Sequence, residues 1–290
     1  MVVEIKDGKV KKILYEIGEM PKFPFIVLLL FIITALLGQF FAPFSPMEAS
    51  LPNQLLPPGS RDNVGNLHLM GTDAFGRDIL SRVIHGAKIS LIVAIPAIFF
   101  AGTIGTLIGL LAGYLEGWVG AVLMRAVDLA LSLPAILMAI ILAVIVGQSF
   151  GIVIAVVAFL LWPRYARQIY GETLQIKHQE FVDLAKVAGC GTLRILIQQI
   201  FPNVVPTLLV LATWQAGYVI LLESSLSFLG VGIPPPAPAW GLMVAEGRGY
   251  IASAWWISLF PGVAILLVIL AINLLGDWLR DRLDPKLATA

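Results

Sequence analysis

The sequence predicts an all-α membrane protein with six transmembrane helices and both termini on the cytoplasmic side. The first observation is composition: 59% of the 290 residues are hydrophobic and 13% are charged, whereas an average soluble domain is about 25% charged. The second is that charges are missing from long apolar runs, as the lipid core requires. The third is that basic residues gather in alternate connections between those runs.

This composition excludes several classes of protein. A soluble enzyme needs more polar residues to cover its surface, and a disordered chain is less hydrophobic. The formal net charge of +1 does not fit a basic nucleic-acid-binding protein. The single cysteine, Cys190, allows no internal disulfide and no thiolate metal cage. The three histidines lie far apart in the sequence, so we expect no metal site.

The apolar runs define the expected spans, because each span requires about 20 mostly apolar residues. The longest run, residues 129–162, holds nearly two spans and is interrupted at residues 147–151 by a sequence typical of a hairpin turn. Residues 230–249 are also poor in charge, but prolines at 234–236 and 238 predict a loop, in part re-entrant. We therefore expect spans over residues 24–43, 89–115, 122–146, 151–170, 195–222 and 249–276.

The basic residues set the orientation. Fourteen of the 19 fall in the two terminal segments, the 114–125 connection and the 164–200 segment, and five fall in the other connections. The positive-inside rule places the larger group in the cytoplasm. The predicted organisation is a cytoplasmic tail (1–23), the first transmembrane helix (24–43), an external segment with an amphipathic helix (44–87), a five-helix core (88–276) and a cytoplasmic tail (277–290).

Small residues and prolines shape the spans. Gly105, Gly109 and Gly113 recur every four residues, which places them on one helix face and predicts close packing against another helix. Prolines within or near the ends of spans should kink them. These prolines are Pro96, Pro134, Pro163 and Pro261.

The sequence offers little chemistry. It holds none of the motifs that bind nucleotide phosphates, catalytic zinc or a nucleophilic serine. Asp128 and Glu223 are the only acidic residues that we place within spans, fewer than a proton- or ion-coupled pump usually carries. We therefore predict a conduit, a receptor or a scaffold that is not itself catalytic.

Three residues are candidates for a translocation path or its gate: Asp128, Trp214 and Glu223. Asp128 follows Arg125 by three residues, which favours a local ion pair near the cytoplasmic mouth. Glu223 should lie near the outer end of the fifth span, paired with Arg248 or with a residue of another chain; gating and structural pairing both remain open. Trp214 either lines a pore or packs in the membrane.

The connection over residues 171–201 is the most informative cytoplasmic segment. Apolar residues at 181, 184, 187 and 188 recur at the spacing of a short amphipathic helix, and Gly189 and Gly191 end it. The apolar stripe of such a helix packs either on the membrane interface and its own bundle or in a groove of a soluble partner.

This connection resembles the EAA loop of ABC-importer permeases, in which Glu-Ala-Ala, a glycine and a Leu-Pro pair follow at fixed spacing. Asp183-Leu184-Ala185, Gly189 and Phe201-Pro202 hold these places, although Asp183, Leu184, Gln199 and Phe201 depart from the usual residues. In that family the loop forms the coupling helix, which sits in a cleft of the ATP-binding subunit. The resemblance implies this role for Glu180, Phe181, Asp183, Leu184, Ala185, Gly189 and Pro202.

Residues 68–82 are similar to the signature G-T-D-x-x-G-R-D-x-x-S-R of the C-type permease of dipeptide, oligopeptide and nickel importers. Residues 222–232 and 273–277 are similar to the C-terminal half of the same subunit. The external signature segment consists of Gly71, Thr72, Asp73, Gly76, Arg77 and Asp78. From the residues themselves we expect Thr72 or Asp73 to cap an external helix over 74–84 that lies on the bilayer, with Asp78 and Arg82 as an exposed ion pair.

The resemblance implies a permease subunit of an ATP-driven importer with the type I fold, in the plasma (inner) membrane of a bacterium or archaeon. It implies a heterodimer with a homologous second permease, two ATP-binding subunits and an external solute-binding protein. ATP and magnesium would bind the ATP-binding subunits, with no cofactor on this chain. The resemblance favours di- or oligopeptides as substrate, with oligosaccharides or nickel chelates as alternatives. A stand-alone secondary transporter and a non-transporting scaffold are the competing functions.

Overall fold

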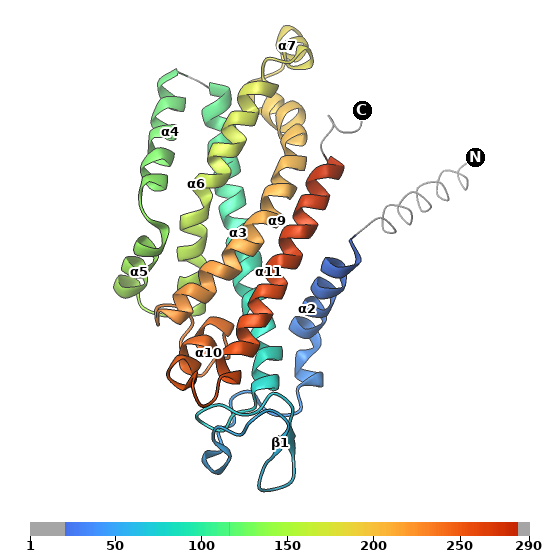
Figure 1. The fold of residues 1–290 in the computed structure, drawn as a ribbon. Coiled ribbons are helices and arrows are strands. Elements are labelled where there is room, and N and C mark those ends of the chain that lie inside the picture. Colours follow the sequence, from blue (N-terminus) through green and yellow to red (C-terminus); the bar gives the residue numbers. More distant parts are fainter. Residues whose placement is uncertain (1–20, 116, 284–290) are drawn as a thin grey trace, which may run out of the picture.

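A computed structural model describes residues 21–115 and 117–283 of the chain and shows long helices running side by side (Figure 1). Most of the predicted tail 1–23 and part of the tail 277–290 lie outside the described residues. The long helices are α2 (Lys22–Phe41), α3 (Ile79–Leu115), α6 (Phe150–Ile176), α9 (Phe201–Phe228) and α11 (Trp256–Leu283). The shorter ones are α4 (Gly117–Ser132), α5 (Ala135–Val146), α7 (Glu180–Val187), α8 (Thr192–Ile195), the π-helical η2 (Leu196–Ile200) and α10 (Trp240–Gly247).

The predicted helical membrane fold is confirmed. Within the described residues, five helical segments are long and apolar enough to span a membrane, the fourth of them being the continuous stretch Thr192–Phe228. The predicted span 122–146 differs, because α4 and α5 meet there at an angle of 88°. Pro134 stands at this break and is the N-cap residue of α5, with extended backbone. A helix does not continue through this position, because proline lacks the backbone N–H donor and its ring clashes with the preceding turn. Counting the bent pair as one span gives six.

Close packing of α3 on α6 is also confirmed. A Cβ atom on Gly105 would lie 2.5 Å from the carbonyl oxygen of Trp162, and one on Gly109 would lie 2.7 Å from that of Ala166. Backbone therefore touches backbone along this interface, and only glycine permits that approach. The contact fixes α6, and the connection that follows it, on the long α3 helix.

The predicted external helix over 74–84 is wrong. Residues 74–78 form a turn with Gly76 at φ +74°, and α3 begins at Ile79 and continues through the membrane span to Leu115. Asp78 caps this helix, since its Oδ2 accepts hydrogen bonds from the Ser81 amide (2.8 Å) and hydroxyl (2.7 Å). The first turns of the spanning helix were thus mistaken for a separate element.

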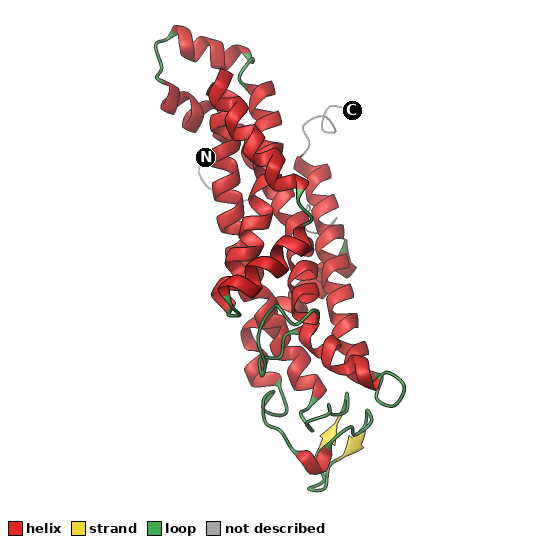
Figure 2. Ribbon diagram, turned by 90° about the vertical axis from the view of Figure 1, so that its left-hand side faces the viewer, coloured by secondary structure: helices red, strands yellow, loops and turns green. Residues whose placement is uncertain are grey.

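The two ends of the bundle differ in structure. One end carries α7, and the other carries a compact segment with the short hairpin β1 (Ser60–Arg61) and β2 (Leu67–His68), as Figures 1 and 2 show. The helix α10 lies at the hairpin end, in the region predicted as a loop. The prolines keep residues 233–239 irregular, and the helix starts directly after them at Trp240. Which end faces the cytoplasm stays a prediction.

Candidate functional site

The helix α7 forms where the sequence predicts the amphipathic helix. Its first turn carries Glu180 and Asp183 and its last turn carries Lys186, which suits the helix dipole. Gly189 ends it at φ +76°, a conformation that glycine adopts without strain. The amide of Gly189 donates to the carbonyl of Lys186, and that of Cys190 donates to the carbonyl of Ala185. The predicted glycine stop is therefore confirmed.

One side chain of α7 is buried and anchors the helix, whereas others on the same helix are exposed on the surface of the chain. Val182 is fully buried in a cluster with Ile176, Ile195 and Ile200, at the ends of α6, α8 and η2. Phe181 and Ala185 pack against this cluster. By contrast, the side chains of Leu184 and Val187 are 69% and 87% exposed. Sequence patterning missed Val182, although its three-residue spacing from Ala185 could have indicated the anchoring face.

Charged groups support the same helix. Lys186 Nζ donates to Asp183 Oδ1 over 2.8 Å, and this hydrogen bond, with the positive charge of Lys186, lowers the pKa of Asp183. Lys177 Nζ donates to the carbonyl of Gly113 over 2.9 Å, which ties the start of the connection to α3. Asp183 is therefore an exposed, ionised carboxylate. Glu180 is exposed, and Pro202 lies exposed in the first turn of α9.

Asp128 has a different main partner from the predicted one. Its Oδ1 accepts a hydrogen bond from Arg167 Nη2 on α6, whereas Arg125 approaches its Oδ2 only to 3.9 Å. The closer pair joins α4 to α6 across 39 residues, a distance in sequence that local spacing rules do not reach.

Trp214 and Glu223 also make contacts between elements. Trp214 Nε1 donates to Asp277 Oδ1 on α11 over 3.3 Å, and the indole is partly exposed. Glu223 is 1% exposed and accepts a hydrogen bond from Ser227 Oγ over 2.8 Å, while its Oε2 has no partner among the described residues. Arg248, the expected partner within this chain, instead lies over the ring of Phe228. Their roles in a path or gate stay predictions.

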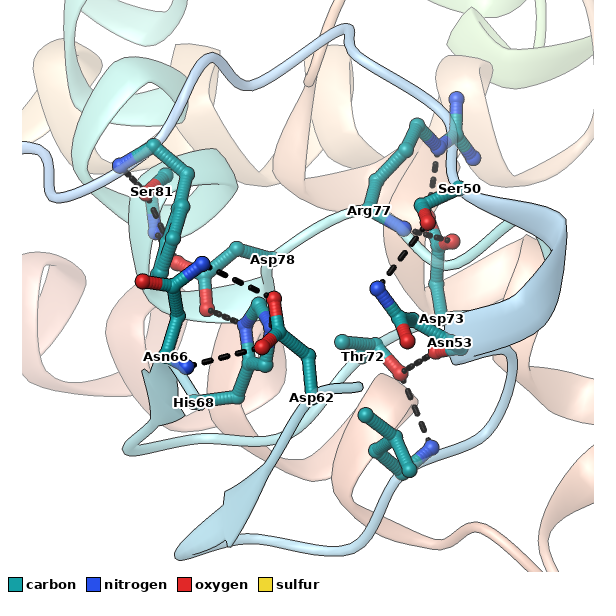
Figure 3. Close-up of polar contacts among 12 residues, drawn as sticks. Ser50, Asn53, Asp62, Asn66, His68, Thr72, Asp73, Arg77, Asp78 and Ser81 are labelled. Atoms are coloured by element: carbon teal, nitrogen blue, oxygen red, sulfur yellow. Dashed lines mark hydrogen bonds and ion pairs between the residues drawn. The ribbon is translucent and has the colours of Figure 1, made fainter. Parts of the chain in front are cut away.

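All six residues of the external signature segment are buried. Thr72 Oγ1 donates to the carbonyl of Asn53 over 2.6 Å and accepts from the amide of Leu56 over 2.9 Å (Figure 3). Gly71 adopts φ +77°, and Trp256 Nε1 on α11 donates to the carbonyl of Thr72 over 3.0 Å. These contacts fasten the segment to the end of the bundle.

The predicted pair between Asp78 and Arg82 is wrong. Asp78 Oδ1 lies 2.9 Å from Nδ1 of the buried His68, as Figure 3 shows. Arg82 points the other way, with its two terminal nitrogens 2.6 Å from Asp73 Oδ2 and 2.9 Å from Glu246 Oε2. Because Asp78 caps the helix, its carboxylate faces the hairpin and the backbone of α3 and cannot also reach Arg82.

Asp73 and Glu246 share a second arginine. Arg77 Nε donates to Asp73 Oδ2 over 2.6 Å, and Arg77 Nη2 donates to Glu246 Oε2 over 3.0 Å. We call Asp73, Arg77, Arg82 and Glu246 the hairpin-end ion network. Its two acids and two bases balance, which is what allows three of the four side chains to be almost fully buried. Glu246 comes from α10, so sequence spacing carried no sign of it.

Comparisons with known proteins agree with this geometry. Residues 105–289 match the family described as binding-protein-dependent transport system inner membrane component. The chain is 39% identical to the di/tripeptide transport system permease protein DppC of Pseudomonas aeruginosa (strain UCBPP-PA14), over 91% of this chain and 88% of that protein. It is 40% identical to the dipeptide transport system permease protein DppC of Escherichia coli (strain K12), over 91% of this chain and 87% of that protein.

A solved structure shares the fold. An inward-facing structure of the MetNI methionine ABC transporter superposes with a TM-score of 0.59 at 18% sequence identity. The match covers 71% of this chain and 98% of the other. The shared part therefore includes most of the helical bundle described above.

Proposed function

The chain belongs to the binding-protein-dependent transport system inner membrane components, which are permeases of ABC importers, and from this premise we propose that it forms one half of a peptide translocation path. The second half is a homologous but distinct permease. Two ATP-binding subunits, with ATP and magnesium, bind on the cytoplasmic side, and an external solute-binding protein delivers the substrate. The assembly lies in the inner membrane of a bacterium or archaeon.

The substrate is a di- or oligopeptide. This proposal rests on relatives at about 40% identity, whose names describe peptide transport. Oligosaccharides and nickel chelates are the alternatives, because permeases of the same group with closely similar sequences carry these substrates. Competition between peptides and either alternative in an uptake assay separates these cases.

The exposed apolar face of α7 is the observation that carries the coupling role. Large apolar side chains exposed outside the membrane mark interaction sites, and Leu184 and Val187 present such a face on a short rigid helix. A helix of this kind binds by inserting its apolar face into a groove of the partner. We infer that the groove belongs to an ATP-binding subunit.

The anchoring contacts then transmit the motion. When the two ATP-binding subunits close on ATP, each carries its bound α7 with it. Val182 packs α7 against the end of α6, and the Lys177–Gly113 hydrogen bond joins that end of α6 to α3, on which α6 packs with backbone contact. A displacement at α7 therefore moves both helices as one body instead of bending a flexible loop. Reorientation of the two permeases in this way would alternate access to the path.

Val187→Asp tests the proposal with a matched control. Val187 and Val64 are 87% and 84% exposed. Val187 is the last residue of α7 and Val64 lies between β1 and β2, and these elements lie at opposite ends of the molecule. Val187→Asp should abolish copurification of the ATP-binding subunits, because a charge replaces an apolar contact, whereas Val64→Asp should leave it unchanged. Asp183→Lys combined with Gly189→Leu should reduce ATPase association and uptake together. Full association of the ATP-binding subunits with both Val187→Asp and the double variant would refute the coupling role.

A further inference from the structure

A small cavity adjoins the hairpin-end ion network. It has a volume of about 230 Å³ and lies between the turn at residues 73–77 and the segment that joins α10 to α11. Its lining includes Asp73, Phe75, Arg77, Glu246 and Tyr250. Most of the residues that line it come from α10 and from the segment that precedes α3, and α10 lies at the hairpin end of the bundle, opposite α7. If α7 faces the cytoplasm, as proposed above, the cavity opens on the side from which substrate arrives.

The wall of this cavity is rigid. Asp73 Oδ1 accepts from the amides of Phe75 (2.8 Å) and Arg77 (2.9 Å), and its Oδ2 accepts from both arginines of the network. All the accepting capacity of Asp73 is therefore used within the chain. Such a satisfied buried network holds its members in one arrangement, so the cavity is preformed.

One carboxylate oxygen of the network remains open to a ligand. Both arginines bind Oε2 of Glu246, while Oε1 has no hydrogen-bond partner among the residues that the structure describes. The Glu246 side chain is also the least buried of the four, at 22% exposed. An ionised carboxylate oxygen that lines a cavity is suited to accept a hydrogen bond from an ammonium or guanidinium group.

The rim of the cavity is aromatic and apolar. Phe75 is 51% exposed, and one face of its ring is covered by the guanidinium of Arg77 at 4.7 Å from the centroid. The amide of Ser50 donates to the carbonyl of Phe75, which places the exposed Leu51 close by. Aromatic rings beside a carboxylate favour a cation, which gains both the charge pair and the ring contact. Exposed apolar side chains outside a membrane also indicate a protein interface.

From these features we propose that the cavity receives a basic side chain of the external solute-binding protein. The inference rests on the proposed function, because that protein is the partner on this side. The volume supports a single side chain, since pockets for small-molecule ligands usually enclose about 300–1,000 Å³. Docking there would place the partner against α10 and the start of α3, next to the turn that the ion network fixes.

The test measures docking of the substrate-loaded binding protein on the complete transporter in lipid nanodiscs. Phe75→Ala should weaken docking about tenfold, as expected for loss of an aromatic anchor. Glu246→Gln keeps the shape but removes the charge, so it should weaken docking by a similar factor and reduce its dependence on ionic strength. Val64→Ala, at the hairpin tip, should leave docking unchanged.

Several outcomes would overturn the inference. Wild-type affinity in both cavity variants would do so, as would an equal loss in Val64→Ala. A loss of the second permease from the Phe75→Ala complex would assign the cavity to that subunit instead. If Glu246→Gln does not assemble, Phe75→Ala decides, because its ring is exposed. A wild-type chain that binds neither ATP-binding subunits nor the binding protein would refute the proposed function itself. If the wild-type chain docks the binding protein and the cavity variants dock it equally well, only the role of the cavity is refuted.

Discussion

Arg82 at the start of α3 and Glu246 on α10 form an ion pair of 2.9 Å between residues that are 164 positions apart. The pair connects the spanning helix α3 to the helix after the proline-rich segment. Arg82 also binds Asp73, so one guanidinium holds three parts of the hairpin end together.

Arg82→Leu should strongly destabilise the protein. Removing one partner of a buried ion pair leaves uncompensated charge and costs about 3–5 kcal/mol. Here Asp73 and Glu246 would share Arg77 alone. Arg125→Leu is the control, because Arg125 is exposed and comes no nearer than 3.9 Å to the carboxylate of Asp128. Fluorescence-detected size exclusion after heating should show a large loss of folded protein for the first variant only; equal melting of both would disprove the structural role.

Gly109→Ala should disrupt the packing of α3 on α6. The added methyl group would lie 2.7 Å from the carbonyl oxygen of Ala166, and overpacking of this kind costs about 1–3 kcal/mol. Gly171→Ala is the matched control within α6, because its added methyl group would meet no atom within 4 Å and alanine favours a helix. Thermal stability should fall for the first substitution and stay equal or rise for the second. A stable Gly109→Ala protein would contradict the close contact.

Glu223→Gln should fold and support transport. Glutamine retains an oxygen that accepts the Ser227 hydrogen bond, and the other carboxylate oxygen of Glu223 has no partner among the described residues. Glu223→Leu should lose stability, because the buried Ser227 hydroxyl then has no acceptor for its hydrogen, while its oxygen still accepts from the amide of Ile233. The initial rate of uptake, compared with thermal stability, distinguishes the roles. Loss of uptake in a fully stable Glu223→Gln protein would show that the charge is required, as in a gate.

The hairpin should respond to acid through Asp62. Desolvation tends to raise the pKa of this carboxyl, but hydrogen bonds from Asn66 and Val64 outweigh it and lower the pKa. A lowered folded-state pKa means that the stabilisation is complete above the unfolded value of about 3.9 and is lost as pH falls through the folded value. The protection factors of the Val64 and Asn66 amides in hydrogen exchange should therefore be constant between about pH 5 and 8 and should fall as the pH is lowered through the folded-state pKa of Asp62. Asp62→Ala should remove that protection at pH 7.

The sequence predicts well what depends on local pattern. Hydropathy located the spans, and the spacing around Phe181 and Leu184, with Gly189 as the stop, located α7. The glycine face of α3 was predictable because Gly105 and Gly109 share one side of a helix. In each case the signal and the structure lie within a few turns of the same helix.

The remaining features depend on contacts between distant segments. Local spacing suggested Asp78 as the partner of Arg82, but the cap at Ser81 and the contact with His68 occupy that carboxylate. The actual partners of Arg82 are Asp73, nine positions away, and Glu246, which the fold brings from α10, so neither lies at a spacing that local rules recognise. Charged residues were likewise expected on the surface, since sequence alone does not reveal a balanced network that permits their burial.

ATP-driven uptake of a labelled dipeptide into proteoliposomes tests the central claim most directly. The vesicles should contain this chain with its second permease and two ATP-binding subunits, and the binding protein should be added outside. If α7 couples this chain to the ATP-binding subunits, uptake should require ATP and should be lost in Val187→Asp but kept in Val64→Asp. Uptake that continues without ATP-binding subunits, or at the wild-type rate in Val187→Asp, would contradict this coupling.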